Sequence, residues 1–306
     1  MALNVWRRGH RVLWGAADRT HGYRLKRHLS NSSYLAQIHR TTSLEWSYLH
    51  VPGPQPLLDL TIGRAVDRAH DLYGDTEALV SVHEGIRKSF SQVKTEAEVV
   101  AAGLVSLGLQ RGDRLGMWGT NNYHWYITQM AAAKAGLVLV NVNPAYRSEE
   151  LLFCLNKVGI KALICDRDFK TSDYYSMVCS AIPEVTISSP GKIKSSAAPH
   201  FKTLIVHSTD VSEHLPGAYK FADLYEAGDS SHMKIVQELG HRLQLNECAN
   251  IQFTSGTTGT PKGAMLSHQN VVNNAAGIGG RSEFDQYSHP QGPMKYFCHG
   301  SVVLNL

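Results

Sequence analysis

Hydrophobic and polar residues alternate along the chain with two periods, one typical of helices and one typical of strands. Apolar residues three or four positions apart predict helices at 60–73, 91–107, 123–135, 148–158, 221–227 and 233–245. Gly74, Gly108 and Gly136 follow three of these helices as stop signals, and Ser91 and Ser148 are expected to cap two of them. Short apolar runs predict strands at 78–83, 86–90, 115–118, 137–142, 162–165, 202–207 and 247–253.

The order of these elements indicates the fold class. From residue 115 onward, strands alternate with helices of about ten to fifteen residues, which is typical of a right-handed α/β fold with a parallel sheet. The apolar run 137–142 predicts a strand that is buried on both faces. Pro144 excludes Asn143 from the helical region and so predicts a turn after this strand. Residues 186–200 are rich in Ser, Pro, Gly and Lys and are expected to form an exposed loop.

A short segment after the last predicted strand carries the clearest chemical signal. It consists of Thr254, Ser255, Gly256, Thr257, Thr258, Gly259, Thr260, Pro261 and Lys262. Glycines allow close backbone approach to a phosphate, hydroxyl groups add neutral donors, and a lysine adds positive charge. The segment is not a Walker A loop, because Lys262 stands between Pro261 and Gly263. A flexible linker is the alternative, but the preceding strand and the helix start at Ser267 favour a phosphate-binding loop.

Composition excludes several classes of protein. The chain has 306 residues, of which 43% are hydrophobic, and this is enough for a large core. Its five cysteines are widely spaced and include no Cys-x-x-Cys pair, which argues against a disulfide framework and against a zinc site. No run of about eighteen apolar residues occurs, so no transmembrane segment is expected.

The net charge of +4 originates at the start of the chain. Residues 1–40 carry eight Arg and Lys against one Asp, whereas the remainder carries 22 basic and 25 acidic residues. A basic, acid-poor N-terminus whose apolar residues can share one face is typical of a mitochondrial transit peptide. We therefore expect residues 1–45 to be a transit peptide and the protein to act in the mitochondrial matrix. A disordered basic tail and a nucleic-acid-binding arm are the alternatives, but this charge distribution argues against nucleic acid as a partner.

Three stretches make the sequence similar to a known superfamily. Phe253 to Gly263 reads Phe-Thr-Ser-Gly-Thr-Thr-Gly-Thr-Pro-Lys-Gly and resembles the signature loop of the adenylate-forming enzymes at every position. Residues 133–150 contain Ala-Lys-Ala-Gly and Asn-Pro-Ala-Tyr and resemble the second core motif of that superfamily. Together with residues 267–274 and the basic leader, they look most like the mitochondrial medium-chain acyl-CoA synthetase branch.

The resemblance implies a fold and a domain organisation. Residues 56–278 are expected to form a partial AMP-binding (adenylation) domain, the N-terminal part of the large domain of an adenylate-forming ligase, with parallel sheets flanked by helices. Residues 279–306 are expected to be a divergent tail, in which 296–302 weakly resembles the next family motif. The later motifs and the small C-terminal domain have no counterpart in this sequence. The chain is therefore expected to be a C-terminally truncated member of the superfamily.

The resemblance also implies a reaction. The carboxylate of a fatty acid attacks the α-phosphorus of ATP, giving an acyl adenylate and pyrophosphate, and the thiol of coenzyme A then forms the acyl-CoA thioester; Mg²⁺ accompanies the ATP. Thr254 to Lys262 are expected to bind the ATP phosphates, and no catalytic or metal-binding residue is assigned. Medium-chain fatty acids, ATP and coenzyme A are the expected small-molecule partners. The alternative is a non-catalytic truncated product that keeps the loop and only binds nucleotide weakly or associates with a partner.

Overall fold

The structure is a computed structural model that describes residues 56–210, 212–254 and 261–281. Its helices are α2 (Ile62–Tyr73), α3 (Phe90–Ser106), α4 (Tyr123–Lys134), α5 (Ser148–Val158), α6 (Tyr174–Ala181), α7 (Leu224–Ala227), α8 (Ser230–Arg242) and α9 (His268–Arg281), with short 3-10 helices η1 (Pro183–Ile187) and η2 (Phe221–Asp223). Its strands are β1 (Glu77–Ser81), β2 (Ile86–Ser89), β3 (Arg114–Trp118), β4 (Val138–Val142), β5 (Ile160–Asp166), β6 (Thr203–His207), β7 (Ala218–Lys220), β8 (Cys248–Thr254) and β9 (Lys262–Ser267). The predicted transit peptide and most of the predicted tail lie outside the described residues.

The strands form two sheets. β1 and β2 pair as the antiparallel hairpin predicted from the sequence. In the described part of the chain, the other strands form one sheet of seven in the order β7-β6-β5-β3-β4-β8-β9, and all neighbours are parallel except β8 and β9. The predicted α/β fold with a mainly parallel sheet is confirmed. The antiparallel strand β9 was not predicted, because it follows a Gly/Thr-rich run and leaves Ala264 and Met265 exposed.

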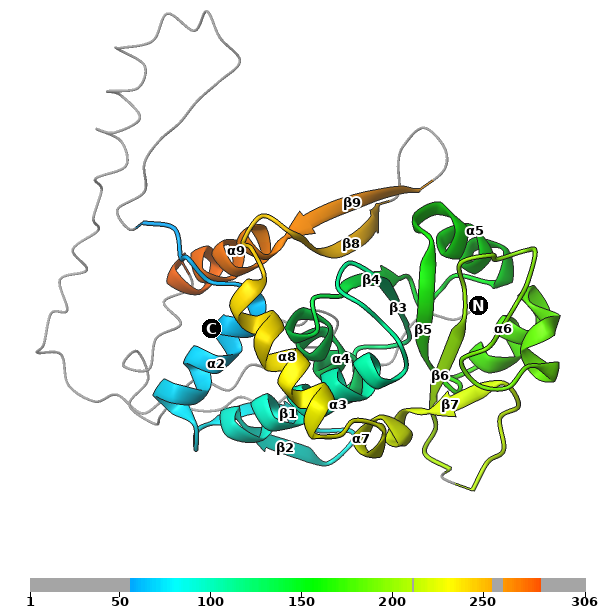
Figure 1. Ribbon diagram of the computed structural model, residues 1–306, viewed down its shortest axis with the longest axis horizontal. Helices are drawn as coiled ribbons and strands as arrows, with labels where there is room; N and C mark the ends of the chain where they lie inside the picture. The colour runs from blue at the N-terminus through cyan, green and yellow to red at the C-terminus, as the bar shows by residue number, and fades with distance from the viewer. Residues whose placement is uncertain (1–55, 211, 255–260, 282–306) are drawn as a thin grey trace, which may run out of the picture. The chain divides into compact units, whose positions relative to one another are not determined.

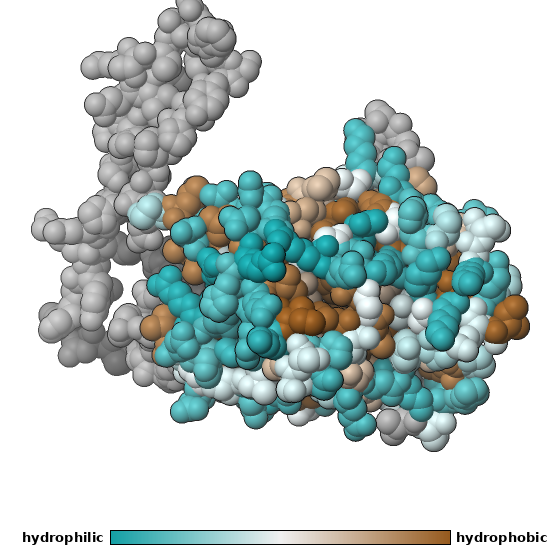
Figure 2. All heavy atoms as spheres, viewed as in Figure 1, coloured by the Kyte–Doolittle hydropathy of each residue, from teal (hydrophilic) through white to brown (hydrophobic). Residues whose placement is uncertain are grey.

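Alternate side chains of the central strands point to opposite faces of the large sheet. Ile164 packs on one face among buried residues of α2, α3, α4 and α8, whereas its neighbour Leu163 packs on the other face among residues of α5 and α6. Figure 1 shows the two groups of helices on opposite sides of the strands. In the same view, Figure 2 shows mainly hydrophilic side chains over α8 and hydrophobic ones between α8 and the β8–β9 hairpin. Helices therefore cover both faces, as a parallel sheet requires.

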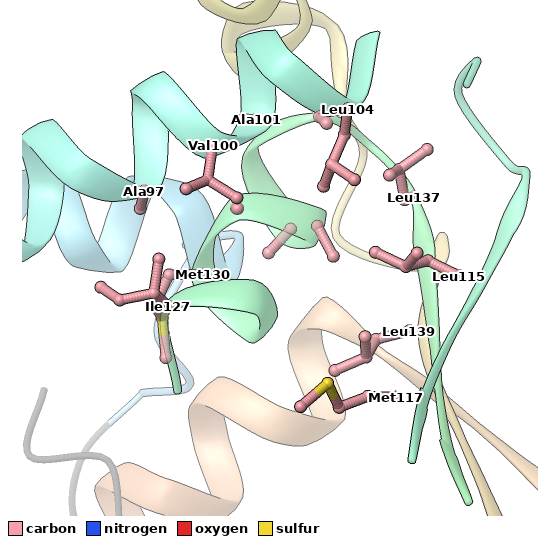
Figure 3. Close-up of a cluster of buried hydrophobic side chains, with 14 of the residues drawn as sticks. Ala97, Val100, Ala101, Leu104, Leu115, Met117, Ile127, Met130, Leu137 and Leu139 are labelled. Carbon is pink, nitrogen blue, oxygen red and sulfur yellow. The ribbon is translucent and has the colours of Figure 1, made fainter. Parts of the chain in front are cut away.

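α3 and α4 pack on the large sheet, and α3 also packs closely on α7. Figure 3 shows side chains of α3 and α4 meeting those of β3, β4 and the residue before β4. The labelled residues are Ala97, Val100, Ala101, Leu104, Leu115, Met117, Ile127, Met130, Leu137 and Leu139, and each is at most 1% exposed. At Gly103 of α3, a Cβ atom would lie 2.2 Å from the carbonyl oxygen of Leu224 in α7. The close contact between α3 and α7 therefore requires a glycine there.

Two predicted helix caps are wrong, and the first is at α3. This helix begins at Phe90, and its cap is Ser89 in place of the predicted Ser91. The hydroxyl oxygen of Ser89 accepts from the N–H of Gln92 (3.3 Å), and the side-chain oxygen of Gln92 accepts from the N–H of Ser89 (2.9 Å). The hydroxyl of Ser91 instead pairs with Nδ1 of His70 (3.0 Å). The reciprocal pair at Ser89 satisfies two N–H groups at the helix start and so decides where α3 begins.

The second wrong cap is at α5. Ser148 is the first residue of the helix, and its hydroxyl donates to the carbonyl oxygen of Met177 in α6 (3.0 Å). The side chain of Glu150 instead reaches back and accepts from the N–H of Arg147 (2.8 Å). Ser148 therefore serves to join α5 to α6.

The segment 186–200 is less exposed than predicted. After η1 ends at Ile187 it has no regular helix or strand, as expected for a loop. Ile193 and Ala198 are nevertheless at most 1% exposed and pack in the core that includes α5 and α6. Ile193 and Ala198 anchor this otherwise mainly polar loop, and two buried residues five positions apart form no helical or strand periodicity.

Candidate functional site

The β8–β9 hairpin carries both ends of the phosphate-binding segment expected from the sequence. In the antiparallel pairing, Phe253 lies opposite Gly263 and Thr254 lies opposite Lys262. The hydroxyl of Thr254 donates to the carbonyl oxygen of Lys262 (3.4 Å). Both residues are exposed. The two ends of the segment are thus held side by side where two paired strands end, away from the rest of the sheet (Figure 1).

The structure describes three of the nine predicted site residues. These are Thr254, Pro261 and Lys262, whereas Ser255, Gly256, Thr257, Thr258, Gly259 and Thr260 lie outside the described residues. The ammonium group of Lys262 makes no ion pair with any residue that the structure describes. An exposed cation beside an exposed hydroxyl can bind an anion without first breaking an internal ion pair.

The hairpin starts beside a strand whose carboxyl end is well fixed. β8 runs parallel to β4, with Gln252 beside Asn141, and the predicted turn at Asn143 follows β4 directly. The carbonyl oxygen of Asn143 accepts from Nε1 of Trp118 (3.1 Å) and from the N–H of Tyr146 (3.0 Å). Ligands of open α/β sheets bind outside the carboxyl ends of parallel strands. The end of β8 therefore lies at the edge of the sheet where a substrate is expected.

A second polar group at this edge was not predicted from the sequence. Asp166 ends β5 and His207 ends β6, and the imidazoles of His207 and His124 stack with their centroids 3.6 Å apart. The two histidines border a cavity of about 130 Å³, which is lined by His124, Val206, His207, Ser208, Lys220, Phe221, Ala222 and Tyr225. The sequence does contain a signal for this polar group, because Asp166 and His207 are the polar residues that end the neighbouring strands β5 and β6.

Asp166 lies beside this cavity and is paired internally, whereas Nδ1 of His124 is buried with no hydrogen-bond partner among the residues that the structure describes. The Asp166 carboxylate is 5% exposed and accepts from the N–H of Thr120 (2.9 Å) and the side-chain amide of Asn122 (2.8 Å). Burial, and then the neighbouring His207, lowers the pKa of His124 to about 4, although nearby carboxylates act in the opposite direction. His124 is therefore uncharged at neutral pH. The cluster holds the start of α4 against β5 and β6 and presents no unpaired carboxylate.

The described residues contain neither a cluster of metal ligands nor a membrane-spanning helix. Within 56–210, 212–254 and 261–281, no group of three or more His, Cys, Asp and Glu side chains is arranged to hold a metal ion. None of the helices in these ranges is long and apolar enough to cross a membrane.

Comparison with known proteins identifies relatives of the chain. The AMP-binding enzyme family matches residues 66–302. The mitochondrial medium-chain acyl-CoA ligase ACSF2 of Danio rerio is 44% identical over 263 residues, which are 85% of this chain and 43% of that protein. The ligase of the same name from Bos taurus is 45% identical over 254 residues, 80% of this chain and 40% of that protein. The chain thus spans about two-fifths of the length of these curated relatives.

Solved structures share the fold at much lower sequence identity. The anthranilate CoA ligase AuaEII, crystallised with anthranoyl-AMP, superposes with a TM-score of 0.58 and 19% identity over 72% of this chain and 37% of its own. The long-chain-fatty-acid-CoA ligase FadD1 of Archaeoglobus fulgidus has a TM-score of 0.58 and 17% identity over 79% of this chain and 43% of its own. At these identities the likeness shows the fold alone.

Proposed function

This chain belongs to the AMP-binding enzyme family, and on that basis we propose that it acts in the ATP-dependent joining of a fatty acid to coenzyme A. The reaction would pass through an acyl adenylate, with release of pyrophosphate, before the thioester forms. The relatives at 44% and 45% identity support this proposal, because both are named as acyl-CoA ligases. Their names also give medium-chain acyl groups and the mitochondrion, so we extend the proposal to medium-chain fatty acids and the mitochondrial matrix.

Within this function, we propose that the segment from Thr254 to Lys262 binds the ATP phosphates. The observation that supports it is the pairing of Thr254 with Lys262, which holds an exposed hydroxyl and an exposed ammonium group together beyond the sheet. Negative charge collects on the β- and γ-phosphates as pyrophosphate leaves. A positioned cation stabilises that charge, which is the main form of catalysis in phosphoryl and nucleotidyl transfer.

Carboxylate-dependent exchange of labelled pyrophosphate into ATP tests the proposal. The exchange is measured for the 306-residue chain, for Lys262→Ala and for the control Lys234→Ala, which changes an exposed lysine of α8. Losing a charged hydrogen bond costs about 1.5–3 kcal/mol, so Lys262→Ala should lower the exchange rate roughly 10- to 150-fold. Octanoate should support faster exchange than acetate or palmitate, and faster exchange with palmitate would contradict the medium-chain assignment.

Equilibrium binding of ATP separates the phosphate site from the complete reaction. In one outcome, the unmodified chain supports no exchange but still binds ATP saturably. If Lys262→Ala then weakens ATP binding and Lys234→Ala does not, the result supports the phosphate site but not the complete reaction. This is also the result expected of a non-catalytic product that keeps the loop. Equal ATP binding by the unmodified chain and Lys262→Ala, or no binding by either, would contradict the phosphate site.

A further inference from the structure

Both ends of the β8–β9 hairpin are tied together at its base. The N–H of His268, the first residue of α9, donates to the carbonyl oxygen of Glu247, the residue before β8 (3.2 Å). In the same way, the N–H of Gln269 donates to the carbonyl oxygen of Leu245 (3.0 Å). β9 extends from this base to Lys262, about 17 Å away at 3.4 Å per residue. The base of the hairpin and the pairing of β9 with β8 together determine where Lys262 lies.

The side chain of His268 connects this base to a helix that starts 206 residues earlier in the chain. His268 is 2% exposed, and its Nδ1 accepts from the N–H of Ile62 at 3.3 Å. Ile62 is the first residue of α2, and N–H groups in the first turn of a helix have no acceptor within it. The hydroxyl of Thr61 caps α2 by accepting from the N–H of Arg64 (3.2 Å). This cap does not reach the N–H of Ile62, and His268 supplies the acceptor for it.

This contact requires a neutral imidazole with its proton on Nε2, because a protonated Nδ1 cannot accept a hydrogen bond. Burial lowers the pKa of His268 to about 4, while the negative charge of Glu247 acts in the opposite direction. Glu247 is itself bonded to the guanidinium of Arg111, at 2.8 Å from Nε and 2.6 Å from Nη2. Among the described residues, the charged group that acts on His268 is thus Glu247, which is paired with Arg111, and α2 contributes the uncharged N–H of Ile62.

A second contact in α9 reinforces the first. The side chain of Asn273 accepts from the N–H of Leu58 (2.7 Å) and donates to the carbonyl oxygen of the same residue (3.2 Å). Leu58 lies four residues before Ile62, so both contacts join the first turns of α9 to the segment that leads into α2. The exit of the hairpin is therefore fixed by residues remote in sequence.

We propose that His268 is a positioning residue for the β8–β9 hairpin, whose neutral imidazole holds the base of the hairpin against α2 and so sets the position of Lys262. The consequence for ATP rests on the proposed function, in which Lys262 binds a phosphate. Protonation of His268 removes the acceptor for Ile62 and places a charge in a buried site, so acid loosens the hairpin.

Two variants separate the hydrogen bond from the titration. His268→Leu removes the acceptor, whereas His268→Asn offers a side-chain oxygen near the position of Nδ1 and cannot titrate. His214→Leu and His214→Asn are matched controls at an exposed histidine. Amide hydrogen exchange of β8 and β9, corrected for the intrinsic rate, is compared near neutral pH and at about pH 5. Protection of β5 in the same samples shows that each variant is folded.

The expected results are quantitative. A group with a pKa of about 4 in the closed state and its ordinary value of about 6.5 when opened makes opening roughly 20-fold more favourable at about pH 5 than at neutral pH. Hairpin exchange in the unmodified chain should rise by that factor, and in His268→Asn it should stay constant. His268→Leu should exchange roughly five- to a hundredfold faster than the unmodified chain near neutral pH, and its exchange should not change at about pH 5 because leucine cannot titrate. If the hairpin of His268→Leu exchanged at the same rate as the hairpin of the His214 variants, the proposal would be overturned.

ATP binding, measured near neutral pH, distinguishes the two proposals. His268→Leu should weaken ATP binding and His268→Asn should restore it. If the hairpin responds as expected but no chain binds ATP, the proposed function fails and the positioning role of His268 stands. If ATP binds and His268→Leu changes neither its affinity nor the hairpin exchange, the positioning role fails. If His268→Leu does not fold, His268→Asn decides the question. A roughly 20-fold pH response in His268→Asn, equal to that of the unmodified chain, would contradict the proposal.

Discussion

Lys134 is a buried cation that joins three helices, and its removal should destabilise the fold. It ends α4 with 6% of its side chain exposed, and its Nζ lies 2.5 Å from a carboxylate oxygen of Asp67 in α2 and 3.1 Å from one of Glu98 in α3. Glu98 also pairs with Lys94 (2.7 Å). Burial raises the pKa of Glu98, but the two lysines outweigh burial and hold that pKa below its ordinary value. The charges of this cluster therefore depend on one another.

The variant Lys134→Met keeps most of the side-chain volume and removes the charge. Removing one partner of a buried ion pair costs about 3–5 kcal/mol. Asp67 is 41% exposed and regains water when Lys134 is lost, so we expect a smaller loss in the free energy of unfolding, about 2–3 kcal/mol. In a domain of this size, each kcal/mol lowers Tm by about 2–4 °C, so Tm should fall by roughly 4–12 °C.

Urea-induced unfolding, followed by far-UV circular dichroism at neutral pH, measures this loss. The control is Lys157→Met, which changes an exposed lysine in the last turn of α5. The double variant Lys134→Met/Glu98→Gln removes both charges of one pair and should recover part of the lost stability. A Lys134→Met chain that unfolds within about 0.5 kcal/mol of the Lys157→Met chain would refute the stabilising role of the cluster.

Two helical glycines should respond to alanine in opposite directions. In Gly103→Ala the new Cβ lies 2.2 Å from the carbonyl oxygen of Leu224, so the free energy of unfolding should fall by more than about 1 kcal/mol. In Gly240→Ala the new Cβ meets open space, so the free energy of unfolding should rise by about 0.5–1 kcal/mol. Urea titrations of both variants check the two signs. The stability of the unmodified chain should fall as the pH drops from about 6.5 to about 4. Burial lowers the pKa of His124 and His268, so in that window only the unfolded chain binds these two protons. Each histidine should lower the free energy of unfolding by up to about 3 kcal/mol. Unfolding midpoints measured across this range check the direction, and a constant midpoint contradicts both assignments.

Local periodicity was sufficient to predict the parallel core but not all helix starts. β5, whose Leu163 and Ile164 point to opposite faces, is visible in the sequence as a continuous apolar run, because both faces of the strand are buried. Ser89 and Ser91 both satisfy the sequence rule for a helix cap. The choice between them depends on the backbone direction where β2 ends, which allows the reciprocal bond between Ser89 and Gln92.

Long-range polar contacts were beyond sequence reasoning for a different reason. Lys134 is visible in the sequence only as an interruption of an apolar run, and its partners Asp67 and Glu98 lie 67 and 36 residues away in the chain. Charged residues on a helix are usually solvated, so nothing local indicates that these three meet. The stacked pair His124 and His207 presents the same difficulty, because one belongs to a helix and the other ends a strand.

The chemistry of the β8–β9 hairpin and its position have separate origins in the chain. The order Pro-Lys-Gly with its surrounding hydroxyls is local, and it was enough to predict an anion-binding segment. The antiparallel strand that brings Lys262 beside Thr254 depends on pairing with β8, and the base of that strand depends on Ile62 near the start of the domain. A substitution at His268 should therefore alter the proposed phosphate binding without changing any residue of the loop, so variants of the loop and of its base test separate parts of the proposal.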